Sequence, residues 1–238
     1  MNVEGISGRF NNLIYVPCCM KRTDRFVWPI VCYFGGDIQN FHDEMIKQNN
    51  HEFLSYSLEN VAKKLSNRFN EHDIFIVQPS KMINSFSLYD NFLQTTKPYG
   101  SPLYDDNDES CFDHFYRLLT NASKQINITI DSIEACLIAF SKGQIVINQL
   151  ARSMHQVSPQ SKFKLTDLYL LDGGHNGSKD FWIIQSKFID SLVKHGCLKF
   201  HIGVTDFQLN KPQNIRQEFE KFHKILLRFC LRRCFFCC

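Results

Sequence analysis

Short apolar runs alternate along this chain with longer segments whose apolar residues recur every three or four positions. The short runs predict buried strands at residues 27–34, 73–79, 133–140, 165–171 and 198–204. The segments between them predict helices with one apolar face at residues 57–69, 112–122, 144–154, 181–193 and from 215 onward. Strands that alternate with helices of this length predict an α/β fold: a doubly wound, mostly parallel sheet with helices on both faces.

The pattern divides the chain into one domain and two flanking segments. Residues 1–26 show no clear periodicity and are expected to be poorly ordered. The domain spans residues 27–224 and contains an insertion at 80–111 with little regular pattern, which predicts a solvated loop or a lid. Residues 225–238 form a tail rich in Cys, Phe and Arg, for which a frayed end is a better interpretation than a membrane-surface anchor.

Composition narrows the class of protein without identifying a ligand. A chain of 238 residues can bury the core of one sizeable α/β domain, and a net charge of +3 is too small to argue for nucleic acid as a partner. There is no apolar stretch long enough to span a bilayer and no apolar signal core at the N-terminus, so a cytoplasmic location is the default expectation. The ten Cys have neither a secretory context nor facing ligand pairs, so we expect no disulfide, metal or cofactor.

The most informative motif lies between the third predicted strand and the helix that follows it. The sequence Ala139-Phe140-Ser141-Lys142-Gly143 has small residues two positions before and two after a serine, which is the spacing of a nucleophile elbow. Such a turn presents the serine oxygen at the carboxyl edge of the sheet, where ligands bind in open α/β folds. The alternative is an ordinary strand-to-helix turn in which the serine caps the helix. The position at the sheet edge favours the elbow.

A serine nucleophile needs hydrogen-bond donors for the negative charge that develops on the attacked carbonyl oxygen. The backbone N–H of Lys142, directly after the serine, is one expected donor. The second is expected from the glycine loop after the first predicted strand, at Gly36 or Asp37. A plain glycine turn is an equally good interpretation of that loop.

The serine also needs a base, and the base needs a carboxylate to orient it. Asp172 and Asp206 follow the fourth and fifth strands, and Asp172 is preferred because the glycines after it let its loop curl inward. Capping a turn or the next helix is an equally good interpretation of Asp172. His175 lies on the same sheet edge and is preferred as the base over His223, which falls on the last helix. His201 lies inside the fifth strand and is expected to be structural. No final strand followed by a histidine loop is visible, although the base usually lies there.

Five stretches carry a resemblance to a known family: residues 33–42 (YFGGDIQNFH), 57–62 (SLENVA), 89–92 (YDNF), 140–143 (FSKG) and 171–175 (LDGGH). Together they resemble the mitochondrial chromosome-2 open-reading-frame-69 family, which is uncharacterised and has an α/β-hydrolase-like fold. The similarity runs from about Val31 to about Phe222, with Gly35 where the family has Pro and Ala139 where it has Gly. From this resemblance we expect the chain to lack the family's N-terminal leader and to depart from the family pattern beyond Lys224.

The resemblance implies a mitochondrial protein that supports respiratory-chain function, with no established substrate. Combined with the motif, it predicts a serine hydrolase in which Ser141 attacks an ester, thioester or amide of an unidentified small-molecule or acyl substrate. The alternative is a non-catalytic protein of the same fold that binds a mitochondrial protein partner, because the terminal histidine loop is missing from the pattern.

Overall fold

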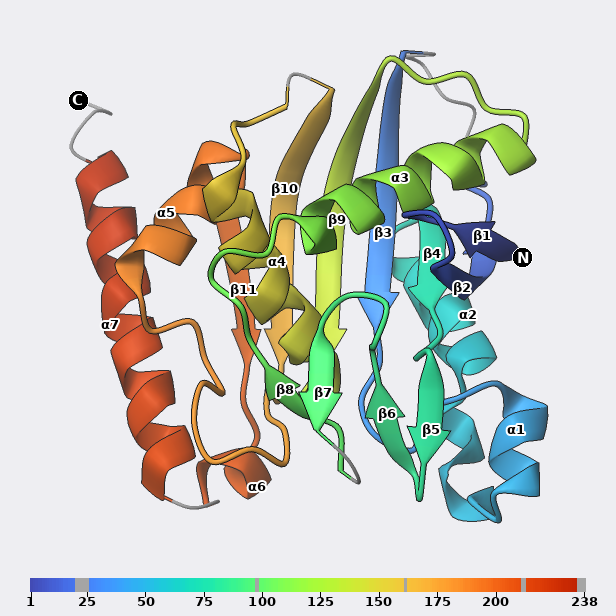
Figure 1. Ribbon diagram of the computed structural model, residues 1–238, viewed down its shortest axis with the longest axis horizontal. Helices are drawn as coiled ribbons and strands as arrows, with labels where there is room; N and C mark the ends of the chain where they lie inside the picture. Colours follow the sequence, from blue (N-terminus) through green and yellow to red (C-terminus); the bar gives the residue numbers. More distant parts are fainter. Residues whose placement is uncertain (20–25, 97–98, 161, 211–212, 235–238) are drawn as a thin grey trace.

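A computed structural model places a seven-stranded sheet at the centre of the protein, with helices on both faces (Figure 1). It describes residues 1–19, 26–96, 99–160, 162–210 and 213–234. In spatial order the strands are β1 (Asn2–Glu4), β2 (Phe10–Val16), β4 (Asp73–Val77), β3 (Val27–Phe34), β9 (Ser132–Phe140), β10 (Phe163–Leu171) and β11 (Lys199–Gly203). β2 pairs antiparallel with β1 and β4, and the remaining neighbours pair in parallel. The predicted mostly parallel α/β sheet is confirmed.

The five predicted strands form because their apolar runs are buried on both faces of the sheet. β4, for example, buries each of its five residues. The register pairs Phe34 of β3 with Ala139 of β9, so these two strands end side by side. The loops that follow them therefore meet at the carboxyl edge of the sheet.

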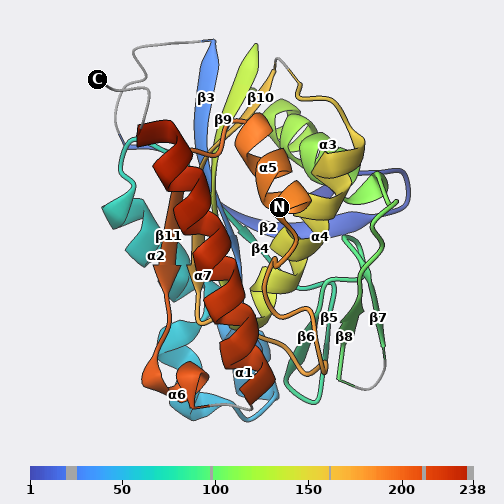
Figure 2. The same ribbon diagram turned by 90° about the vertical axis from the view of Figure 1, so that its left-hand side faces the viewer.

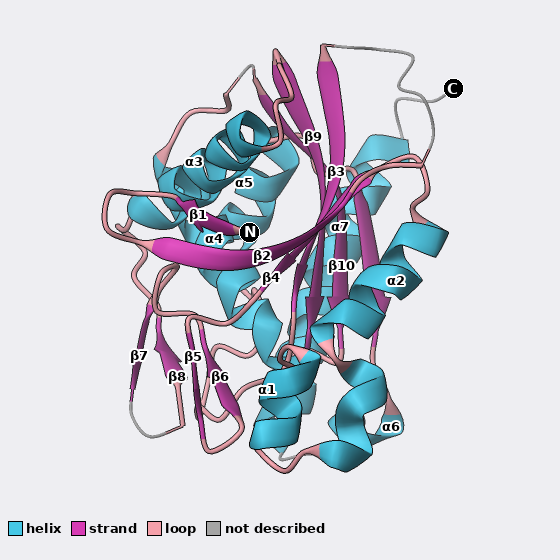
Figure 3. Ribbon diagram, turned by 90° about the vertical axis from the view of Figure 1, so that its right-hand side faces the viewer, coloured by secondary structure: helices cyan, strands magenta, loops and turns pink. Residues whose placement is uncertain are grey.

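Helices α3, α4 and α5 cover one face of the sheet and α2 covers the other (Figure 3), while α7 runs along the edge strand β11 (Figure 2). The helical elements are α1 (His42–Lys47), the 3-10 helix η1 (His51–Tyr56), α2 (Leu58–Arg68), α3 (Ser110–Gln125), the 3-10 turn η2 (Ser141–Gly143), α4 (Gln144–Gln156), α5 (Ser186–Lys194), α6 (Asp206–Leu209) and α7 (Gln213–Cys234). The helix predicted from residue 57 is α2, and Ser57 caps it by accepting a bond from the Asn60 N–H. The helix predicted from residue 181 begins only at Ser186, because Phe181 and Trp182 fill the core from a loop.

The described part of the N-terminal segment, residues 1–19, is ordered, which corrects the expectation of poor order there. Within it β1 and β2 extend the sheet, and Val3 and Leu13 are buried; residues 20–25 lie outside the described part. Asn11 and Asn12 interrupt the apolar alternation of β2, and asparagine is depleted in strands, so the pattern concealed this element.

The insertion at 80–111 is also folded rather than a solvated loop. It forms two hairpins, β5 (Lys81–Ile83) with β6 (Phe86–Leu88) and β7 (Gln94–Thr96) with β8 (Ser101–Leu103). In Figure 1 both hairpins lie at the end of the molecule toward which β3 and β9 point. Strands of three residues are too short to produce a periodic pattern, which is why the sequence did not reveal them.

The last helix continues past the predicted domain boundary at residue 224. α7 runs to Cys234, Leu226 is buried, and Phe229 packs against the core. The described part of the tail is therefore a continuation of α7, and residues 235–238 lie outside it. Among the described residues, we find no helix with the length and apolar character required to cross a bilayer.

A buried histidine joins the N-terminal strands to α3. His114 Nδ1 accepts a hydrogen bond from the Ile6 N–H (3.1 Å), and its Nε2 lies 2.8 Å from Asn11 Oδ1. The accepting Nδ1 carries no proton, so the ring is neutral and Nε2 donates to Asn11. Burial, aided by the positive charge of Arg9, lowers the pKa of His114 to about 4.

We expect the protein to lose stability as the pH falls from about 6.5 to about 4. The unfolded chain binds a proton at an imidazole pKa near 6.5 and the folded chain only near 4, so the contribution of neutral His114 is complete above pH 6.5 and is lost below it. The loss at pH 4.5 is on the order of 2–3 kcal/mol. Denaturant unfolding at pH 7 and pH 4.5 measures it. The difference should shrink in His114→Gln and persist in His223→Gln, a change at an exposed position of α7; equal pH dependence in the two variants would contradict the assignment.

Candidate active site

Ser141 lies on a sharp turn between the central strand β9 and α4. The strand ends at Phe140, one 3-10 turn follows, and α4 begins at Gln144. Ser141 has a φ of +50°, in the left-handed region that costs a residue with a side chain about 1–2 kcal/mol. The turn therefore holds the serine in a strained backbone conformation, as a nucleophile elbow does.

Two glycines let this turn approach the loop after β3. A Cβ on Gly143 would lie 2.1 Å from the Phe34 carbonyl oxygen, and a Cβ on Gly36 would lie 2.8 Å from Ser141 Cβ. Neither space admits a methyl group, so both positions require glycine. The loop predicted to supply an oxyanion donor therefore lies directly against the predicted nucleophile.

The donors in this loop are not all free. The Gly36 N–H donates to Gln39 Oε1 (2.9 Å), which also accepts a bond from the Tyr33 hydroxyl (2.8 Å). Gly36 therefore shapes the loop, and its N–H already has an acceptor. The backbone N–H groups of Asp37 and Lys142 remain the predicted pair of donors.

Left-handed backbone conformations occur in the loops that follow three neighbouring parallel strands. The φ angle is +72° at Ile38 after β3, +50° at Ser141 after β9 and +49° at Asp172 after β10. A β-branched residue such as Ile38 rarely adopts this region, and its N–H donates to the Ser85 carbonyl of the first hairpin (2.8 Å). Unfavourable backbone angles of this kind cluster at functional sites.

Asp172 uses its carboxylate to join two loops. One oxygen accepts a bond from the Thr205 N–H (2.6 Å) and the other from the Thr205 hydroxyl (2.9 Å). The carboxylate thereby connects the loop after β10 to the loop after β11, and both of its oxygens are occupied without a histidine.

Both ring nitrogens of His175 are engaged within its own loop. Nδ1 accepts a bond from the Gly177 N–H (2.9 Å), so Nε2 carries the proton and donates to the Asp180 carbonyl (3.3 Å). The ring stacks on Phe181, with 4.7 Å between centroids. Burial lowers the pKa of His175 to about 4, so the ring is neutral at pH 7.

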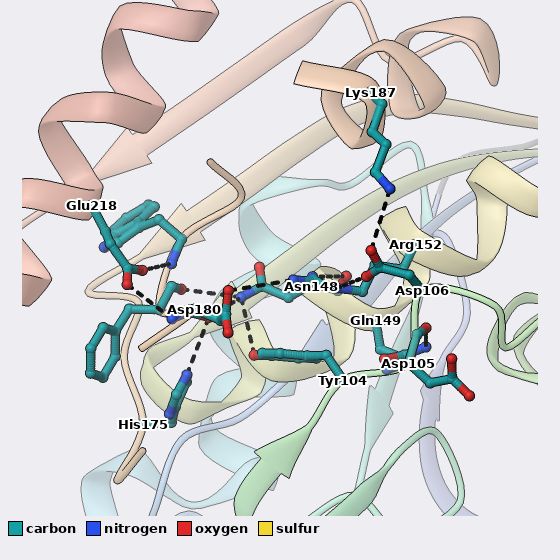
Figure 4. Close-up of polar contacts among 12 residues, drawn as sticks. Tyr104, Asp105, Asp106, Asn148, Gln149, Arg152, His175, Asp180, Lys187 and Glu218 are labelled. Atoms are coloured by element: carbon teal, nitrogen blue, oxygen red, sulfur yellow. Dashed lines mark hydrogen bonds and ion pairs between the residues drawn. The ribbon is translucent and has the colours of Figure 1, made fainter. Parts of the chain in front are cut away.

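A polar network holds this loop from two sides (Figure 4). From α7, Glu218 accepts bonds from the N–H groups of Asp180 (2.9 Å) and Trp182 (3.1 Å). From α4, Asn148 Nδ2 donates to the Asp180 carbonyl (3.2 Å). The loop from His175 to Trp182 is therefore fixed between the two helices.

The predicted site residues fall into two groups. The first group lies where β3 and β9 end and consists of Ser141, Gly36, Asp37 and Lys142. The loop that carries Asp172 and His175 is adjacent, since the Gly174 N–H donates to the Ser141 carbonyl (3.3 Å). However, Asp172 and His175 bind other partners than each other and Ser141, so the predicted relay from carboxylate to histidine to serine is not formed by these contacts.

Comparison with known sequences defines the family. The chain matches the profile of the C2orf69 family over residues 1–134 and 122–232. The chain belongs to the C2orf69 family. The mitochondrial protein C2orf69 of Homo sapiens is 27% identical over 256 residues, which cover 82% of this chain and 66% of that protein. The homologue of Mus musculus is 28% identical over 255 residues, covering 82% of this chain and 69% of its own. The alignments thus span about two thirds of the relatives' length.

Solved structures overlap only loosely with this member of the C2orf69 family. A carboxylesterase from Bacillus cereus gives a TM-score of 0.43 at 12% identity and covers 90% of this chain and 94% of its own. An acylaminoacyl peptidase from Pyrococcus horikoshii gives 0.39 at 9% identity, covering 96% of this chain and 40% of its own. The strand order of the sheet defines the fold here, not these overlaps.

Three further residues of this C2orf69-family chain were considered from the sequence: Asp206, His223 and His201. Asp206 is exposed at the start of α6, and His223 is exposed on α7. His201 lies 2.9 Å from Asp167 and stacks on Tyr169, contacts that agree with the structural role expected for it.

Sequence reasoning missed the residues that the insertion contributes. Tyr89 is buried and its hydroxyl donates to the Gly35 carbonyl (2.9 Å), and Ser87 binds the Asp37 carboxylate. The one usable signal was the family-like stretch at 89–92. Single polar residues in short hairpins, such as Ser87, give no such signal.

Replacing Ser141 with glycine should stabilise the protein. Glycine adopts a φ of +50° without steric cost, and this gain exceeds the added chain entropy, for a net of about 0.5–1 kcal/mol. Ser141→Ala keeps the strain and should bring no such gain. Ser66→Gly, within the regular helix α2, is the control and should destabilise by about 0.5–1 kcal/mol. Urea unfolding compares the three, and a similar loss in Ser141→Gly and Ser66→Gly would show that the turn is not strained.

Proposed function

We propose that this protein is a serine hydrolase of the α/β class, with Ser141 as its nucleophile toward an ester, thioester or amide. The observation that carries the proposal is the strained elbow, in which Ser141 is held at a φ of +50° against the Gly36 loop. Such strain persists only where the surrounding structure enforces it, and it is a feature of nucleophile elbows.

In the proposed reaction the Ser141 oxygen bonds to the acyl carbon while the carbonyl electron pair moves onto the carbonyl oxygen. The backbone N–H groups of Asp37 and Lys142 donate to this oxyanion. Collapse of the tetrahedral species expels the alcohol, thiol or amine and leaves an acyl-serine, which water hydrolyses to the acid. The serine proton passes to a base and then to the leaving group.

The proposed reaction requires a base that accepts the Ser141 proton. His175 was predicted as the base and Asp172 as the carboxylate that orients it, but the bonds to Thr205, Gly177 and Asp180 favour a structural role for both in the loop after β10. A base must lie within hydrogen-bond reach of the serine, although such contacts sometimes form only with substrate bound.

A second candidate function is favoured by the bonds that occupy both ring nitrogens of His175. A protein of this fold whose histidine is committed to its loop would act without catalysis, as a factor that binds another mitochondrial protein. The curated relatives are named mitochondrial proteins. We propose the same location for this chain, and a role in supporting respiratory-chain function, under either candidate.

A fluorophosphonate probe tests the nucleophile. The probe forms a covalent bond to an activated serine, so we expect time-dependent labelling of the purified protein that is abolished in Ser141→Ala. Ser123→Ala, at a serine of α3, is the matched control and should label like wild type. Equal labelling of wild type and Ser141→Ala would refute the hydrolase and leave the binding factor.

The same probe distinguishes a structural role of His175 from a role as the general base. If its ring only shapes the loop, His175→Gln should change the labelling rate at pH 7.5 by less than about threefold, and this is the result that the contacts predict. Loss of a true general base would lower the rate by about 100-fold or more. The labelling rate of Asp172→Asn should match that of His175→Gln in either case. A loss of about 100-fold or more in both variants would support the predicted relay from Asp172 through His175 to Ser141.

A further inference from the structure

The residue after the predicted nucleophile carries a buried positive charge. The Lys142 side chain is 1% exposed, although lysine is almost never fully buried unless its charge is paired. Removing an ammonium group from water is costly unless it is both paired and hydrogen-bonded. Burial lowers the pKa of Lys142, and the nearby Asp37 carboxylate opposes that shift.

The ammonium group meets three different segments. Lys142 Nζ donates to the Tyr99 carbonyl (2.5 Å), which follows β7 in the second hairpin. It lies 3.4 Å from Asp37 Oδ1 in the loop after β3, and 5.2 Å from the ring centroid of Phe86 in the first hairpin. One charged group therefore links the serine turn to the oxyanion-side loop and to both hairpins.

Asp37 extends this link. Its Oδ1 also accepts bonds from the Ser87 N–H (2.8 Å) and the Ser87 hydroxyl (3.1 Å) in β6. The same carboxylate oxygen is thus held both by Lys142 and by the first hairpin. The backbone N–H of the same residue is a proposed oxyanion donor, so fixing the carboxylate also restricts where that N–H points.

We propose that the side chain of Lys142 is a positioning residue: it fastens the loop after β3 and the two hairpins against Ser141, and so orients the Asp37 N–H toward the acyl oxygen. This inference rests on the function proposed above. The side chain acts through Asp37 and Tyr99, separately from the Lys142 backbone N–H beside the serine.

The test compares three variants. Lys142→Met keeps the length of the side chain and removes its charge. Asp37→Asn keeps an oxygen for Ser87 and removes the charge that faces Lys142. Lys187→Met is the matched control, because Lys187 also joins a helix to the inserted segment, through Asp106 (3.3 Å), but is 45% exposed.

Two readouts are measured: amide hydrogen exchange at residues 85–88 and 99–103, and inactivation by the fluorophosphonate, resolved into a maximal rate and a half-saturating concentration. Lys142→Met should speed exchange at both hairpins at least about 10-fold and lower the maximal rate about 10- to 100-fold. Its half-saturating concentration should stay within about threefold, because the site still forms. Asp37→Asn should also speed exchange at the hairpins and lower the maximal rate, each by a smaller factor than Lys142→Met does. Lys187→Met should match wild type in both readouts.

Unchanged exchange at the hairpins in Lys142→Met would overturn the inference, as would an unchanged maximal rate. Faster exchange throughout β9 and β10 would also overturn it, since that result marks a general loss of stability. If Lys142→Met does not fold, Asp37→Asn decides by the same criteria. If wild type does not react with the probe, the proposed function fails, and exchange at the hairpins alone decides whether Lys142 holds them.

Discussion

The Gly143 backbone passes so close to the Phe34 carbonyl oxygen that a Cβ would lie 2.1 Å from it. This contact fixes where the turn after β9 lies relative to the loop after β3. It leaves Ser141 between the two segments with a left-handed backbone, and it places Gly36 against the serine. The next side chain, Lys142, is then enclosed beneath the insertion. The arrangement around the serine follows from an approach of two backbones that leaves no room for a side chain at Gly143.

The insertion completes this arrangement because it is joined to α4 along much of that helix (Figure 4). Beyond Lys142, Asn148 donates to the Tyr104 hydroxyl (3.1 Å) and Gln149 exchanges bonds with the backbone of Asp105. Arg152 is buried, pairs with Asp106 (3.0 Å) and lies 4.3 Å from the Tyr104 ring centroid. The helix that starts at the serine turn is therefore also the support for the inserted segment, and the two are best regarded as one unit.

The sequence allowed the parallel core to be predicted, because strands such as β3 and β9 are continuous apolar runs and helices such as α2 have one apolar face. It also allowed the sharp strand-to-helix turn at Ser141 to be predicted, because the requirement for small residues around that turn is local. The contacts made by the loop after β10 could not be predicted. The partners of His175 and Asp172 are backbone groups and a threonine, which become neighbours of these side chains only on folding. The hairpins were missed for a related reason: their strands are short, and contacts such as those of Asp37 with Ser87 and Lys142 join residues far apart in sequence.

The most direct test of this account is a crystal structure of the protein after reaction with a phosphonate ester. The account predicts a covalent bond from the Ser141 oxygen to phosphorus, with the phosphonyl oxygen about 3 Å from the backbone nitrogens of Asp37 and Lys142. An adduct on another residue, or a phosphonyl oxygen directed away from both nitrogens, would contradict it.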